Sequence, residues 1–234
     1  MTYICERRIY SMMEEKVKIS IAAISDLHGS WMKWGKEMKY PDPELVIVAG
    51  DICRSDVYGD QEKEIPEFLD RLQDIFPASQ QILVVPGNHD FWLERNWKYR
   101  NLGYSIKVLV DQEYTYESWS SFRTLRVYGG PWTDCGGGWA FQKLGYREDI
   151  AKIPRELDIL ITHEAPRFYG LRCIKESIGD YGDEEPGCKK LADKVDLVKP
   201  KVHVFGHIHK PCVWDNGVTK FYNVSGSGFT FLEV

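Results

Sequence analysis

The sequence predicts an α/β fold in which short buried strands alternate with amphipathic helices. Three observations lead to this prediction: five short runs rich in Val and Ile, two segments with apolar residues at helical spacing, and polar residues directly after every run. Runs of this length and composition are typical of strands buried on both faces of a sheet. The 234 residues are enough for one large domain.

The five runs are the predicted strands, and two longer segments between them are the predicted helices. The runs are Lys18–Ile24, Glu44–Ala49, Gln81–Val85, Leu157–Ile161 and Lys201–Phe205. Gln61–Phe76 and Cys188–Val198 carry apolar residues on one helical face, and Pro200 ends the second helix. The Gly- and acid-rich stretches Gly129–Gly138 and Arg167–Gly187 are predicted loops.

Residues 1–17 are predicted to be an extension onto a single domain of residues 18–234. The extension carries Arg7, Arg8 and Glu14 around no apolar core, so it does not have the pattern of a secretory signal. The chain contains no apolar window of the length a membrane span needs, and its six cysteines form no C-x-x-C pair. We therefore expect a cytoplasmic protein with reduced thiols and no membrane partner.

The charge balance argues against one class of partner. Lys and Arg number 30 against 35 Asp and Glu, a net charge of −5, whereas nucleic-acid binding generally needs a basic surface. We expect no stable nucleic-acid binding. A small anionic substrate is compatible with the acidic chain, because bound metal ions supply local positive charge.

Potential metal ligands follow each predicted strand. They are Asp26 and His28 after the first run, Asp51 after the second, Asn88, His89 and Asp90 after the third, His163 after the fourth, and His207 and His209 after the fifth. Ligands bind at the carboxyl ends of strands in open α/β sheets, so these side chains can converge. Asp, Asn and His without thiolates are typical donors for Mn, Fe, Zn, Co or Ni. His203 lies inside a run and is predicted to be a hydrogen-bonded structural residue.

The motif order D-x-H, G-D, G-N-H-D, H and G-H-x-H, from Asp26 to His209, resembles the calcineurin-like metallophosphoesterase superfamily. Tyr128–Trp132, Trp139–Phe141, Ile159–His163 and His203–His209 are similar to its metallophosphoesterase-domain (MPPED) branch. The resemblance implies two facing β-sheets, a β-sandwich flanked by helices in a four-layer architecture. It also implies a metal-dependent phosphoesterase.

The resemblance further implies two divalent metal ions and a role for each ligand. Asp26, His28 and His209 would hold the first ion, Asn88, His163 and His207 the second, Asp51 would bridge them, and His89 would be the catalytic histidine. Two ions about 3.5–4 Å apart can stabilise the attacking and leaving oxygens of a phosphoryl displacement, with a bridging hydroxide as nucleophile. Proton donation from His89 to the leaving alkoxide is typically an effect of about 10²–10⁴-fold.

Two positions differ from the related enzymes. Protein phosphatases of the superfamily have an Asp three residues after the bridging Asp, whereas Arg54 stands there in this chain. Protein phosphatase activity is therefore not expected, and the sequence does not identify the residue that orients His89. Arg54 either binds phosphate or is a solvated loop residue. Glu164 stands where the similar branch usually has Gly. We predict that it faces solvent, the alternative being a negative charge that favours diesters over monoesters.

Several aromatic residues lie near the motifs, namely Phe91, Trp92, Trp97, Trp132 and Trp139. Such side chains either pack in the core or stack on a nucleobase. Packing is predicted overall, with Trp132 as the stacking candidate. The predicted function is hydrolysis of small phosphodiesters, cyclic nucleotides among them. The alternatives are a phosphomonoesterase or nuclease of the same fold, and a non-catalytic scaffold.

Overall fold

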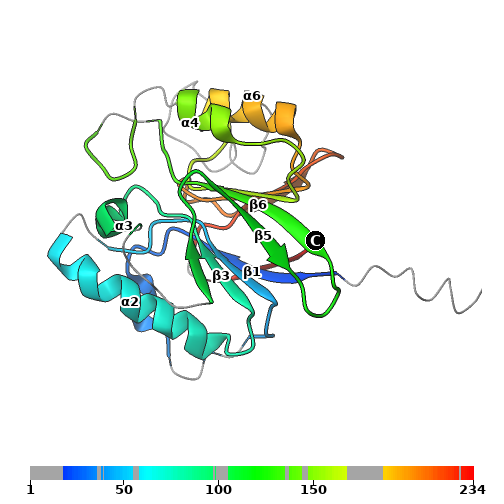
Figure 1. Ribbon diagram of the computed structural model, residues 1–234. Helices are drawn as coiled ribbons and strands as arrows, with labels where there is room; N and C mark the ends of the chain where they lie inside the picture. The colour runs from blue at the N-terminus through cyan, green and yellow to red at the C-terminus, as the bar shows by residue number, and fades with distance from the viewer. Residues whose placement is uncertain are drawn as a thin grey trace, which may run out of the picture.

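A computed structural model of the chain describes residues 18–35, 38, 40–54, 58–96, 98, 105–134, 137–143, 147–167, 187–226 and 228–234. Two β-sheets face each other, and helices cover their outer faces (Figure 1). The layers run from α2 through the two sheets to α4 and α6 (Figure 1). The predicted α/β architecture of two facing sheets in four layers is confirmed.

The first sheet has the strand order β11-β1-β2-β3-β4. Its strands are β1 (Ser20–Ile24), β2 (Leu45–Val48), β3 (Gln81–Val84), β4 (Ile106–Val108) and β11 (Thr230–Glu233). β1 to β4 are parallel, and β11 joins β1 antiparallel. The carboxyl ends of β1, β2 and β3 therefore lie at one edge of this sheet.

The second sheet has the strand order β5-β6-β7-β8-β10-β9. Its strands are β5 (Gln112–Glu117), β6 (Thr124–Gly130), β7 (Ile159–Thr162), β8 (Val202–Phe205), β9 (Cys212–Asp215) and β10 (Lys220–Asn223). β6, β7, β8 and β10 are parallel, and the edge strands β5 and β9 are antiparallel to their neighbours.

The strands that the sequence predicts, β1, β2, β3, β7 and β8, are buried on both faces. In β1, Ala22 and Ile24 face the cluster under α2, whereas Ile21 and Ala23 face the cluster between the sheets. Alternate side chains of a strand point to opposite faces, so a strand with two buried faces needs a continuous apolar run. The runs identified in the sequence have this physical cause.

Within the part of the chain that the structure describes, five helical segments surround the sheets: η1 (Ser30–Lys33), α2 (Tyr58–Ile75), α3 (Phe91–Asn96), α4 (Arg147–Lys152) and α6 (Lys189–Val198). α2 packs on the first sheet through residues such as Phe68 and Leu72, and α6 packs on the second through Leu191 and Val195. Lys199, in the left-handed conformation, caps the end of α6 before Pro200. No helix within the described ranges is long and apolar enough to cross a membrane.

The five predicted strands and two predicted helices are confirmed, with ends that differ by up to three residues. One loop boundary was wrong, because Gly129 and Gly130 belong to β6. A Cβ at Gly129 would collide with the side chain of Leu109, so this part of the strand needs a glycine to pack. The proposed extension of residues 1–17 and most of the predicted loop, residues 168–186, lie outside the described residues.

Candidate metal centre

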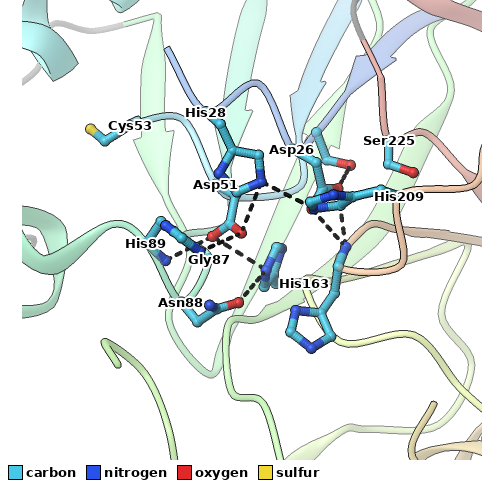
Figure 2. Close-up of polar contacts among 12 residues, drawn as sticks. Asp26, His28, Asp51, Cys53, Gly87, Asn88, His89, His163, His209 and Ser225 are labelled. Carbon is cyan, nitrogen blue, oxygen red and sulfur yellow. Dashed lines mark hydrogen bonds and ion pairs between the residues drawn. The ribbon is translucent and has the colours of Figure 1, made fainter. Parts of the chain in front are cut away.

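Loops from both sheets bring the predicted site residues together. Asp26 and His28 follow β1, Asp51 follows β2, Asn88 and His89 follow β3, His163 follows β7, and His207 and His209 follow β8. Figure 2 shows the side chains of Asp51, His28, His163 and His209 turned toward one another. Three overlapping groups of donor atoms, drawn from Asp26, His28, Asp51, His89, His163 and His209, each lie within 4.8 Å.

The first part of the centre is formed by Asp26, His28 and His209. The Nε2 atoms of His28 and His209 lie 3.0 Å apart, and Nε2 of His209 lies 3.2 Å from Oδ1 of Asp26. Two donors about 2.1 Å from one ion and at right angles to each other are about 3.0 Å apart, so this spacing fits a shared divalent cation. Without a cation, two ring nitrogens could approach this closely only by sharing a proton.

The second part of the centre is formed around His163, which is fully buried. Its Nδ1 lies 2.8 Å from the carbonyl oxygen of Ala49, to which an Nδ1–H donates, and this leaves Nε2 as a lone-pair donor facing the site. Nε2 lies 2.9 Å from Oδ1 of Asn88 and 3.3 Å from Oδ1 of Asp51. When Nε2 is unprotonated, all three atoms carry lone pairs and face one another, so a proton or a metal ion between them would stabilise the arrangement.

The pKa values of His163 and Asp51 also indicate a centre that stabilises positive charge. Burial lowers the pKa of His163, but Asp51 and Asp26 outweigh it and raise the pKa to about 10. Burial raises the pKa of Asp51, yet His163 and His89 hold it well below its usual range. Both shifts show that this centre stabilises positive charge, which a proton or a metal ion can provide.

His207 is held by its backbone as well as by its ring. Its N–H donates to the carboxylate of Asp26, 3.0 Å from each oxygen, and its ring lies 5.1 Å from that of His163. Burial lowers the pKa of His207 to about 4, so the ring is neutral near pH 7 and can act as a donor. His207 therefore lies beside the second part of the centre.

Four of these residues have the left-handed backbone conformation that non-glycine residues rarely adopt. The φ angles are 55° at Asp26, 44° at His28, 56° at Asp51 and 66° at His207. Such strain persists only where the surrounding structure enforces it, and it is concentrated at functional sites. Here it lets the chain turn sharply after a strand and point successive side chains at the same centre.

Asp90 ties two of the loops together rather than orienting His89. Its carboxylate accepts backbone N–H groups of Gly87, Asp51, Ile52 and Cys53 at 2.8–3.3 Å. Burial and the charge of Asp51 raise its pKa to about 7. These hydrogen bonds hold the loops after β2 and β3 together. In the sequence, the only sign of this role is an Asp directly after the G-N-H motif.

The prediction that Glu164 faces solvent was wrong. Glu164 is 5% exposed, and Oε2 accepts the N–H of Asp134 at 3.1 Å. Burial raises its pKa to about 7. The physical reason is that the loop after β6 passes over the loop after β7, where its N–H group needs a buried acceptor.

Among the aromatic residues that the structure describes, Trp132 is a packing residue and Trp139 lies beside the site. Nε1 of Trp132 donates to Asp111 at 2.9 Å, and the Nζ atom of Lys143 lies 3.9 Å from its ring centroid. The ring of Trp139 lies 4.4 Å from that of His89. The expectation of a stacking role for Trp132 was therefore wrong.

The other individual predictions have mixed outcomes. His203 is fully buried, and its Nε2 lies 2.8 Å from Oγ1 of Thr162, which confirms a hydrogen-bonded structural histidine. Trp92 is 2% exposed and packs in the core, as predicted. Arg54 is exposed next to Gly29, so both of its proposed roles stay predictions. Trp97 lies outside the described residues.

The layered α/β fold and the cluster of Asp, Asn and His at its strand ends define a metal-dependent phosphoesterase scaffold. The profile of the Calcineurin-like phosphoesterase family matches residues 19–211. The chain belongs to this family, whose activity depends on metal ions.

The chain is also similar to individual proteins. A UPF0046 protein from Caenorhabditis elegans is 29% identical over 229 residues, which span 89% of this chain and 75% of that protein. Metallophosphoesterase domain-containing protein 1 from Homo sapiens is 28% identical over 211 residues, 80% of this chain and 61% of that protein. The resemblance to the metallophosphoesterase-domain branch is thereby confirmed.

Two solved structures share the fold. The protein TT1561 of Thermus thermophilus has a TM-score of 0.55 at 13% identity, covering 88% of this chain and 89% of that one. Phosphopantetheinyl hydrolase (PptH) from Mycobacterium tuberculosis has a TM-score of 0.54 at 16% identity, with 91% of each chain covered.

Proposed function

We propose that the protein hydrolyses small organic phosphodiesters, cyclic nucleotides among them, with two divalent ions bound at the centre. The proposal depends on one observation, the placement of Asp51. This carboxylate is 2% exposed, with Oδ2 3.7 Å from Nε2 of His28 and Oδ1 3.3 Å from Nε2 of His163. Its two oxygens thus face two separate groups of donors, as a carboxylate shared by two ions would.

The proposed ligands divide between the two sides of Asp51. Asp26, His28 and His209 would hold one ion, and Asn88, His163 and His207 the other. Bound divalent ions supply Lewis acidity and lower the pKa of a bound water. The chain itself supplies the buried carboxylates and the imidazole rings that would bind such ions, together with the hydrogen bond from His163 to Ala49 that fixes its ring.

His89 is the proposed proton donor. Its Nε2 lies 4.0 Å from Oδ2 of Asp51, and its side chain is 22% exposed, so it borders the centre and is open to a substrate. A protonated imidazole in this position can donate to the leaving oxygen of the ester as the P–O bond breaks. The leaving group then departs as a neutral alcohol rather than as a strongly basic alkoxide.

Charge supports a diester rather than a monoester. Within the described part of the chain, Asp26 and Asp51 form ion pairs with histidines alone. The buried carboxyl of Glu164 follows His163 directly and interacts with its charge. A monoester dianion needs more fixed positive charge than a diester monoanion, and these residues do not provide it.

We further propose a cytoplasmic location and a small-molecule substrate. The cysteine composition supports the first, and Cys53 fits it, since it is buried and burial raises the pKa of its thiol. The net charge of −5 supports the second, because stable nucleic-acid binding needs a basic surface.

The proposed function is tested with metal-stripped protein and bis(p-nitrophenyl) phosphate. Mn, Ni, Co, Zn or Mg is added back, and the monoester p-nitrophenyl phosphate is assayed in parallel. We expect metal-dependent cleavage of this diester that falls at least about 100-fold in Asp51→Asn, while His203→Gln keeps the rate. With diphenyl phosphate, whose leaving group needs a proton, His89→Ala should lower the rate at least about 100-fold. Cleavage of the monoester alone would replace the diesterase by a phosphatase. Bound metal without cleavage of either ester would favour a scaffold.

A further inference from the structure

The ring of His89 has no hydrogen bond to fix its orientation within the described residues. Its Nδ1 is buried without a partner, and the 4.0 Å between its Nε2 and Oδ2 of Asp51 is too long for a hydrogen bond. The χ2 torsion of a histidine is broad, so a ring without such a bond can rotate. Asp90, the nearest carboxylate in sequence, is committed to backbone N–H groups.

Two other rings enclose the imidazole instead. The centroid of Trp139 lies 4.4 Å away with the planes tilted by 35°, and the centroid of His28 lies 4.6 Å away at 83°. One neighbour is thus tilted against the imidazole and the other presents an edge, at separations close to those of favourable aromatic contacts. Rotation about χ2 would drive the imidazole into one or the other.

Trp139 is itself anchored to the loop that carries His89. The backbone N–H of Trp139 donates to Oε1 of Gln142 at 3.1 Å. The backbone N–H of the next residue, Ala140, donates to the carbonyl oxygen of Asn88 at 3.0 Å. Phe141 donates its N–H to Glu94 at 2.7 Å. Trp139 is 38% exposed, so its side chain is not part of the core, whereas the backbone around it is hydrogen-bonded to the site.

We infer that Trp139 is a positioning residue for His89, its indole taking the place of a hydrogen-bonding partner in holding the imidazole toward the leaving oxygen. The inference rests on the proposed function, in which His89 donates the proton. A misoriented donor slows those esters whose leaving group most needs a proton, and it leaves esters with an acidic leaving group much less affected.

The test compares bis(p-nitrophenyl) phosphate with diphenyl phosphate, whose phenol is the poorer leaving group. We expect Trp139→Ala to lower kcat for diphenyl phosphate by about 10–100-fold and for the nitrophenyl ester by less than about 3-fold, with KM unchanged. Trp139→Phe should restore most of the rate. Trp119→Ala, at an exposed tryptophan on the turn between β5 and β6, is the matched control. The double variant with His89→Ala should be no slower than His89→Ala alone.

A readout independent of turnover is the NMR spectrum of the imidazoles in metal-stripped protein. The resonances of His89, identified by their loss in His89→Asn, should be displaced by the indole ring current and should shift in Trp139→Ala. Unmoved resonances would overturn the contact, and equal losses on both esters, or a change in KM alone, would overturn the positioning role. Failure of wild type and Trp119→Ala to cleave either ester would overturn the proposed function instead.

Discussion

The buried histidine His203 makes the stability of the protein depend on pH in a way that can be calculated. It is fully buried, donates to Thr162 through Nε2, and has no partner for Nδ1 within the described residues. Burial lowers its pKa from 6.5 to about 3. The unfolded chain therefore binds a proton that the folded chain excludes, so this contribution is intact above pH 6.5 and is lost as pH falls toward 3.

The magnitude follows from the two pKa values. Between pH 7 and pH 5 the unfolded histidine becomes protonated, whereas His203 in the folded chain does not, which costs about 2 kcal/mol of the free energy of unfolding. His203→Gln keeps a donor for Thr162 but does not titrate. The stability difference between wild type and His203→Gln should therefore change by about 2 kcal/mol over this range.

Urea unfolding of metal-stripped protein at pH 7 and pH 5 measures this difference, since removal of the ions separates it from the loss of metal ligands on protonation. A difference that stays constant within about 0.5 kcal/mol would contradict a neutral buried His203.

Three other predictions concern the metal centre. Gly206→Ala should weaken metal binding, measured by calorimetry, at least about 10-fold, because the added Cβ would collide with Oδ2 of Asp26 and crowd Ser25. An unchanged affinity would contradict a requirement for glycine beside Asp26. At pH 8, above the pKa of about 7, Glu164→Gln should raise the ratio of monoester to diester cleavage several-fold by removing a buried charge near His163, and an unchanged ratio would exclude this electrostatic role. Adding a divalent ion at about 100 times its Kd should stabilise the protein by about 2.7 kcal/mol, or raise Tm by about 5–10 °C, and an unchanged Tm would mean that the folded centre does not bind it.

The five predicted strands were predictable because both faces of each are buried, which forces a continuous apolar run such as Leu45–Val48. Strands with exposed residues, such as β5 and β9, lack such a run and were not predicted. The pairing of strands into two sheets was not predictable from such runs, because pairing joins residues far apart in sequence. It came from the family resemblance. Gly129 shows the same limit, since the close packing at its position in β6 depends on Leu109, which lies 20 residues earlier in the chain.

The candidate ligands were predictable because they occupy the first positions after the strands, where the topology alone brings them together. Residues whose roles depend on the return of a distant loop were not. Glu164 is buried by the segment that carries Asp134, and Trp139 reaches His89 through a turn anchored on Asn88. Sequence patterns extend over a few neighbouring residues, so they do not predict contacts between distant loops.

The measurement that tests the two-ion centre most directly is the anomalous diffraction of crystals soaked in Mn²⁺. We predict two peaks about 3.5–4 Å apart on either side of the Asp51 carboxylate, one near His28 and His209 and the other near His163. In Asp51→Asn at least one peak should be lost. A single peak in the wild-type protein, or two peaks that do not both contact Asp51, would contradict a carboxylate shared by two ions.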